Sequence, residues 1–303
     1  MHVILAGSGD LARYICEEFT KAGHTLTVLT RSHKPQFEQP GVSQCITDYS
    51  LSSLEQPLAD GEVLISVISD FTDAFINVHR ALIQACQQSL KCKRFIASEF
   101  AGDIETYPDQ PGFYYRTRGP VRKMLQDQTD IEWTCVSNGW LADYLLPAKN
   151  RYIKDIGDEH PVNLVESALV IPGTGIEPVD FTWARDVAKA LAQLVNATLW
   201  EPYTYMSGER ACWNSIATLL KDKYDRDFKT SYVSLDDITK SIRTAKDENA
   251  LFLADHHLFS ASHASSLPKD TVQAHREKYF PGIHFRTLEE GFSELDCTPE
   301  IIL

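Results

Sequence analysis

Short apolar runs alternate with amphipathic stretches along the first half of the chain. Residues 2–6 and 63–68 are apolar at nearly every position, which predicts strands buried on both faces of a sheet. Between them, Leu11, Tyr14, Ile15 and Phe19 recur at the spacing of one helix face. This alternation predicts six strands joined mostly by helices, near residues 2–6, 25–29, 42–46, 63–68, 93–97 and 133–136, with helices near 74–89 and 121–128.

The pattern changes after about residue 140, where Pro and Gly become frequent. A helix is predicted for 184–195, a late strand for 203–206 and a helix for 213–224. We therefore expect an α/β chain with a Rossmann-type doubly wound parallel sheet and a smaller, discontinuous substrate-binding lobe. Residues 1–150 would form the cofactor-binding domain, to which later segments at about 180–210 return. Residues 151–303 would mainly form the substrate-binding lobe.

A glycine turn joins the first strand to the first helix. Residues 7–12 read G-S-G-D-L-A, a G-x-G-x-x-A pattern in the strand–turn–helix–strand context of dinucleotide-binding folds. The glycines permit a tight turn and a close approach of the pyrophosphate, and the helix N-terminus offers free N–H groups to it. We expect the turn to bind the cofactor through Gly7, Ser8, Gly9, Asp10 and Leu11.

Basic residues follow the second strand, where NAD-binding chains carry a carboxylate for the ribose 2′-hydroxyl. Arg31 and Lys34 are instead placed to meet a 2′-phosphate, so NADP(H) is the expected cofactor. The alternative is a solvated basic loop. Ser69, Phe71 and Ser98 stand at the ends of two later strands, and we expect them to contact the cofactor as well.

Composition narrows the possible partners. The formal net charge is −13, which disfavours nucleic acid and acidic membrane surfaces and leaves a small molecule as the expected partner. The seven cysteines show no metal-ligand spacing, so we expect no metal site. Their number is odd and they form no C-x-x-C pair, so we expect the reduced thiols of a cytoplasmic protein. Because the first strand is predicted to begin at residue 2, we expect no targeting segment. A homodimer is possible.

The segment 93–100, K-R-F-I-A-S-E-F, resembles the K-R-F-x-P-S-E-F motif of the isoflavone reductase and phenylcoumaran benzylic ether reductase family, atypical short-chain reductases of the NmrA-like group. The resemblance continues in order along nearly the whole chain, at residues 9–13, 22–25, 138–144, 171–175, 181–188, 279–283 and 288–290. It is closest to the fungal members. It implies a Rossmann-type fold and an NADPH-dependent reductase of a small aromatic or polyketide-like secondary metabolite.

One departure from this family falls at the expected active site. Plant members carry a catalytic Lys in a K-x-x-[IV]-R pattern, and residues 118–122 here read R-G-P-V-R. Arg118 cannot act as a base, but it can hold the nicotinamide ribose, orient a substrate oxygen or stabilise a developing oxyanion. Tyr114 lies four residues earlier, on the same face if this segment is helical, and Arg118 would lower its pKa and make it the proton donor. Alternatively, the tyrosine only packs against the cavity.

Five more residues are expected to form the substrate pocket: Glu99, Phe100, Asn138, Trp140 and Tyr144. Glu99 has a structural anchor as its alternative role, and Trp140 and Tyr144 can equally be core residues. Two other functions remain open beside the reductase. One is a non-redox enzyme, an isomerase or cyclase, which the missing Lys keeps open. The other is a dinucleotide-sensing NmrA-like regulator that acts through a partner protein.

Overall fold

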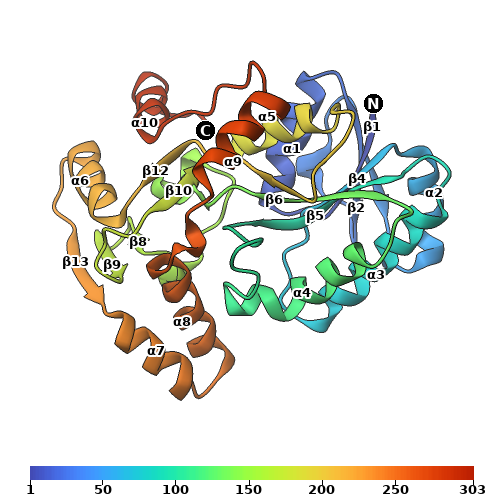
Figure 1. Cartoon of the computed structure of the whole chain (residues 1–303). Coiled ribbons are helices and arrows are strands. Elements are labelled where there is room, and N and C mark those ends of the chain that lie inside the picture. Colours follow the sequence, from blue (N-terminus) through green and yellow to red (C-terminus); the bar gives the residue numbers. More distant parts are fainter.

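A seven-stranded parallel sheet forms the centre of the first lobe (Figure 1). The computed structural model describes residues 1–303. The strands follow the order β11-β6-β5-β4-β1-β2-β3, so the chain reverses its direction of travel between β1 and β4. They are β1 (His2–Ala6), β2 (Thr25–Thr30), β3 (Val42–Ile46), β4 (Val63–Ser66), β5 (Arg94–Ala101), β6 (Glu132–Ser137) and β11 (Tyr203–Tyr205).

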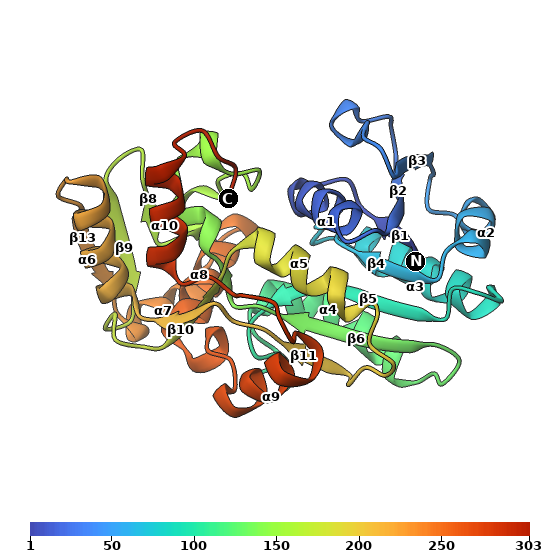
Figure 2. The same cartoon turned by 90° about the horizontal axis from the view of Figure 1, so that it is seen from above.

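Helices cover both faces of this sheet, which explains why its strands are apolar throughout (Figures 1 and 2). Alternate residues of β1 point to opposite faces, so Val3 and Leu5 join one apolar core and Ile4 and Ala6 the other. The first core packs beneath α1 (Asp10–Lys21) and α5 (Ala184–Leu194), and the second beneath α2 (Leu51–Asp60), α3 (Asp73–Gln88) and α4 (Gly112–Gln126).

The expected α/β fold with a doubly wound parallel sheet is confirmed, with two local differences. The helix predicted near 121–128 begins earlier, at Gly112, because Pro120 does not end it. Helix α2 connects β3 to β4, and its short amphipathic pattern was not recognised in the sequence. The earlier start of α4 matters because it places Tyr114 and Arg118 on the same helix.

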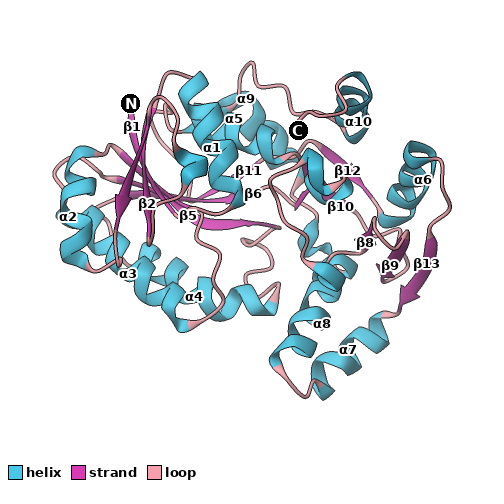
Figure 3. Ribbon diagram, turned by 180° about the vertical axis from the view of Figure 1, so that it is seen from behind, coloured by secondary structure: helices cyan, strands magenta, loops and turns pink.

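The second lobe contains two small sheets and a layer of helices (Figure 3). One sheet has the order β12-β10-β7 and the other β13-β9-β8, and a separate apolar core lies between them and the helices. Its elements are β7 (Trp140–Leu141), β8 (Val162–Asn163), β9 (Ala168–Pro172), β10 (Val179–Thr182), β12 (Glu209–Ala211), β13 (Lys229–Val233), α6 (Trp213–Tyr224), α7 (Leu235–Thr244), α8 (Glu248–Ala261) and α10 (Leu288–Cys297).

The chain passes between the lobes more than once. After β10, α5 packs on α1 and β11 joins the edge of the central sheet beside β6. The late helix α9 (Lys269–Tyr279) then returns to the same region, where Tyr279 and Phe280 join the first core. No helix has the combination of length and apolar character needed to span a membrane.

Candidate functional site

The glycine turn lies at the carboxyl end of β1, where the direction of the sheet order changes. Gly7 has φ +110°, and a Cβ there would lie 3.1 Å from the backbone of Val67 and Ile68. A side chain at Gly7 would therefore strain the turn. A Cβ on Gly9, in contrast, meets nothing within 4 Å, so open space lies in front of the first turn of α1. This arrangement leaves room for a phosphate group at the helix N-terminus.

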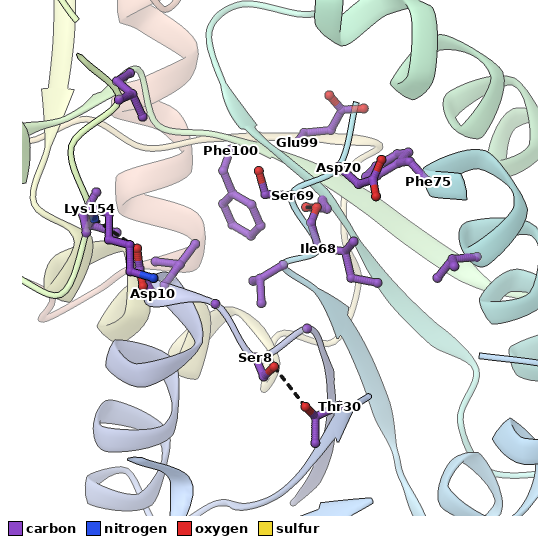
Figure 4. A pocket seen from close by; sticks show the side chains of 18 of the residues that line it. Ser8, Asp10, Thr30, Ile68, Ser69, Asp70, Phe75, Glu99, Phe100 and Lys154 are labelled. Carbon is purple, nitrogen blue, oxygen red and sulfur yellow. Dashed lines mark hydrogen bonds between the residues drawn. The ribbon is translucent and has the colours of Figure 1, made fainter. Parts of the chain in front are cut away.

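A cleft of about 600 Å³ extends from this turn along the carboxyl ends of the strands (Figure 4). Ser8 approaches β2 through a 3.0 Å hydrogen bond between its hydroxyl and that of Thr30. The exposed side chain of Arg31 and the half-buried side chain of Lys34 line the cleft, and Arg31 also lines a shallow polar recess beside it. The structure thus brings together the expected cofactor-binding residues Gly7, Ser8, Gly9, Asp10, Leu11, Arg31, Lys34, Ser69 and Ser98.

The remaining residue of that group, Phe71, lies outside the cleft and lines a neighbouring aromatic cavity. Ser98 lines the cleft, but its hydroxyl donates a 2.8 Å hydrogen bond to the carbonyl oxygen of Ile68. This bond ties the end of β5 to the loop after β4, which gives Ser98 a structural role.

Because of a bulge at the end of β5, the side chains of Glu99 and Phe100 point to different sides. The register of β5 against β6 shifts between Ala97 and Ala101, and Phe100 has φ +49°, a region that non-glycine residues seldom occupy. The Phe100 ring consequently projects into the cleft, whereas the Glu99 carboxylate points to another side (Figure 4). Strained backbone of this kind is concentrated at functional sites.

Arg118 of α4 is buried at the inner wall of the cleft. Its guanidinium donates 2.8 Å hydrogen bonds to the carbonyl oxygen of Asp70 and to the hydroxyl of Thr117. The guanidinium carbon lies 4.1 Å from the ring centroid of Phe75 and 4.3 Å from that of Tyr114. Both hydrogen-bond partners are neutral oxygens, so the positive charge is held in place without a direct ion pair.

The structure corrects the expected effect of Arg118 on Tyr114. The guanidinium lies over the face of the phenol ring, as in a cation–π contact. Burial raises the pKa of Tyr114 and outweighs the lowering by Arg118, because the phenolate would lose its hydration inside the protein. Tyr114 therefore stays protonated at neutral pH, which is the state a proton donor needs.

Glu99 is a buried residue in the wall of the cleft. Its carboxylate forms a single long ion pair. Its Oε1 lies 3.4 Å from Nε of Arg122, and its Oε2 has no hydrogen-bond partner. Burial raises the pKa of Glu99, although Arg122 and Arg118 oppose this shift. An unpartnered buried carboxylate oxygen beside a cavity is costly, which is typical of functional positions.

An aromatic cavity of about 240 Å³ adjoins the cleft and shares Phe100, Tyr114 and Tyr144 with it. Trp140 and Phe71 complete this side of the cavity. The start of α4 and α8 add Phe113, Phe252, His256 and Phe259 to its wall.

Sequence reasoning missed the contribution of α8. His256 stacks on Phe113 with 4.2 Å between ring centroids, and its Nδ1 donates a 3.0 Å hydrogen bond to the carbonyl oxygen of Phe252. Burial lowers the pKa of His256 to about 4, so its ring is neutral at pH 7. The only available signal was the run of Phe252, His256 and Phe259 at helical spacing, which does not say where that face packs.

Asn138 does not line either cavity, contrary to expectation. Its side chain is fully buried and donates a 3.0 Å hydrogen bond to the carbonyl oxygen of Gly139. Its backbone carbonyl accepts a 2.7 Å hydrogen bond from the hydroxyl of Thr182. Asn138 therefore shapes the crossing from β6 to β7. No cluster of three or more His, Cys, Asp or Glu side chains is arranged to hold a metal ion.

The model of the NmrA-like family matches residues 2–291 of this chain. The chain belongs to the NmrA-like family. It is 60% identical to a protein named oxidoreductase swnR from Arthroderma benhamiae, over 100% of both chains. It is 25% identical to the isoflavone reductase homolog A622 of Nicotiana tabacum, over 96% of both. The expected similarity to NmrA-like and isoflavone reductase-like proteins is thus confirmed.

The fold of a solved relative agrees with this assignment. The leucoanthocyanidin reductase of Vitis vinifera, solved as a binary complex with NADPH, superposes with a TM-score of 0.76. The alignment covers 98% of this chain and 100% of the reductase, at 20% identity. The cleft described above therefore belongs to a fold that has been solved with a dinucleotide.

Proposed function

We propose that the protein is an NADPH-dependent reductase of a small aromatic or polyketide-like secondary metabolite. The observation that carries this proposal is the continuity of the cleft. At one end it presents a glycine turn with two basic side chains, and at the other it meets a buried cation and an aromatic cavity. The relatives named as oxidoreductases or reductases support the same chemistry.

The residues at the β2 end of the cleft fit NADP(H). The space before Gly9 accepts the pyrophosphate, and Arg31 and Lys34 supply positive charge for a 2′-phosphate. No acidic residue stands at the end of β2, where one would select the ribose 2′-hydroxyl of NAD. The bound cofactor would supply the hydride.

Residues of this chain would donate the proton and stabilise the negative charge that develops on the substrate. Phe71, Trp140 and Tyr144 hold the substrate in a water-poor aromatic pocket. Arg118 stabilises negative charge as it develops on a substrate oxygen, and Tyr114, kept protonated by burial, donates the proton to that oxygen. Glu99, at the same wall, is suited to polar contact with the substrate or to proton exchange with the cleft.

A non-redox isomerase or cyclase on the same scaffold is the second candidate. It is favoured by Arg118, because a fixed cation polarises a substrate without serving as the family's base. Both candidates place the substrate in the same aromatic cavity.

The cofactor assignment is tested by titrating NADP⁺ and NAD⁺ calorimetrically. The substitution Arg31→Ala should weaken NADP⁺ binding by about 1.5–3 kcal/mol, the scale of a hydrogen bond to a charged group, and leave NAD⁺ nearly unchanged. The control is Arg80→Ala, which removes an exposed cation of α3 that bonds Asn77. Equal losses of affinity for both cofactors would show that Arg31 does not bind the 2′-phosphate.

The reaction is tested by incubating the protein and NADPH with a panel of aromatic ketones, enones and quinones. A reductase consumes NADPH in proportion to product. Conversion without NADPH consumption, sustained equally by a cofactor analogue that cannot donate a hydride, identifies the isomerase. Binding of NADP⁺ without conversion of any panel member favours a dinucleotide-sensing regulator.

A further inference from the structure

A six-residue segment of the second lobe lies across the helix that follows the glycine turn. This strap, residues 151–156, is attached to α1 by Tyr152. The backbone N–H of Tyr152 donates a 2.8 Å hydrogen bond to the Tyr14 hydroxyl, and its own hydroxyl donates one of 2.6 Å to Glu17. The guanidinium of Arg13 covers the Tyr152 ring at 3.5 Å. The strap is therefore fixed to the helix at several points.

The next contact places the strap at the mouth of the cleft. The backbone N–H of Lys154 donates a 3.0 Å hydrogen bond to Oδ2 of Asp10, in the first turn of α1 (Figure 4). Ile153, just before it, is buried in the first core and also lines the cleft. The backbone of Lys154 thus has a defined position beside the glycine turn.

The ammonium group of Lys154 has no protein partner, although its side chain lines the cleft. Lys149, two residues before the strap, pairs with Glu300 at 2.7 Å and lies outside the cleft. Arg151 is buried and bonds the carbonyl oxygens of Leu146 and Ile153. Among these three cations, Lys154 alone is free to meet a ligand in the cleft.

We propose that Lys154 binds the pyrophosphate of the cofactor, so that the second lobe supplies a cation that the glycine turn lacks. This inference rests on the proposed cofactor. The first turn of α1 carries an acid, Asp10, whose charge opposes an anion at the helix N-terminus. The backbone N–H of Lys154 bonds that same acid, which places the base of a cationic side chain beside the carboxylate. Arg31 and Lys34, at the end of β2, remain for the 2′-phosphate.

The test measures the dissociation constants of NADP⁺ and NAD⁺ for the full chain and its variants by calorimetry. Lys154→Met keeps the apolar stem and removes the charge, and it should weaken both cofactors by the same factor, about tenfold, because both carry the pyrophosphate. Lys154→Arg should retain most of the affinity. Lys149→Met is the matched control and should change neither constant. Thermal melting without cofactor verifies that each variant is folded.

Combination with Arg31→Ala identifies the phosphate concerned. If the two cations contact different phosphates, their effects on NADP⁺ multiply in the double variant. A loss confined to NADP⁺, or strongly non-additive effects, would place Lys154 at the 2′-phosphate and overturn the inference. An unchanged dissociation constant in Lys154→Met would also overturn it and leave the proposed function intact. Absence of NADP⁺ binding by the unmodified protein would refute the proposed function itself.

Discussion

Arg118 offers the most direct test of the chemistry, because it is a cation at the wall of the cleft with no direct ion pair. At an effective dielectric constant of about 20, a unit charge about 4 Å from a guanidinium is stabilised by about 4 kcal/mol. Loss of one oxyanion-stabilising donor lowers turnover by a factor on the order of 10²–10³, equivalent to about 2.7–4 kcal/mol. The two values agree, so we expect Arg118→Met to reduce turnover by a factor in that range.

Replacement by Met tests the charge of Arg118 separately from the packing of its side chain. Its flexible apolar side chain can still pack against Phe75 and Tyr114, which the guanidinium now contacts, whereas Ala would leave a cavity. Arg118→Lys keeps the charge but loses the planar arrangement of donors, and it should retain part of the turnover. Tyr114→Phe should also impair the reaction, because the ring remains and the proton donor is lost.

Turnover is followed through NADPH absorbance, with the substrate identified in the panel described above, and cofactor affinity is measured separately. Wild-type turnover in a folded Arg118→Met protein with normal cofactor affinity would show that the reacting oxygen lies elsewhere. Loss of cofactor affinity together with turnover would instead show that Arg118 holds the cofactor.

Two further predictions concern cofactor binding and stability. Gly9→Val should abolish cofactor binding and leave the melting temperature nearly unchanged, because its Cβ meets no protein atom and occupies the space before α1; Gly7→Ala, at φ +110°, should lower the melting temperature instead. Retained NADP⁺ affinity in Gly9→Val would make the turn purely structural. His79 is fully buried, and burial lowers its pKa to about 3 from 6.5, so the unfolded state binds a proton that the folded state does not. The free energy of unfolding is therefore undiminished by His79 above pH 6.5 and declines as the pH falls from 6.5 toward 3. The substitution His79→Gln should make the free energy of unfolding less dependent on pH across that window. An identical slope in both proteins would contradict the assigned shift.

The features that local sequence determines were predictable. The turn at Gly7 and Gly9 follows from the strand and helix that flank it, and the position of Arg31 at the end of β2 follows from parallel strand order. Helical spacing placed Tyr114 and Arg118 on one face, and the structure shows them in contact. These inferences needed only neighbours within about one helix or strand.

The features that depend on packing between the lobes were not predictable. Tyr152 reaches Tyr14 across 138 positions, and no pattern in either segment signals that contact. His256 lines the aromatic cavity because α8 packs against the start of α4. The pKa of Tyr114 illustrates the same limit: the charge of Arg118 was visible in the sequence, but the opposing and larger effect of burial was not. The expectation for Asn138 was wrong because its side chain is buried against the carbonyl oxygen of Gly139, whereas Gly139 and Trp140 line the aromatic cavity.

The aromatic cavity is built from several separate parts of the chain. Part of its wall comes from the loop after β4, the end of β5, the start of α4 and the start of the second lobe, whereas Phe252, His256 and Phe259 come from α8, which forms a hairpin with the largely exposed α7. Changes along the α8 face can therefore alter which molecules enter without disturbing the glycine turn or Arg118. A scaffold divided in this way can diversify the molecules it binds during evolution while its dinucleotide cleft stays intact, and exchange of the hairpin offers the corresponding route for engineering.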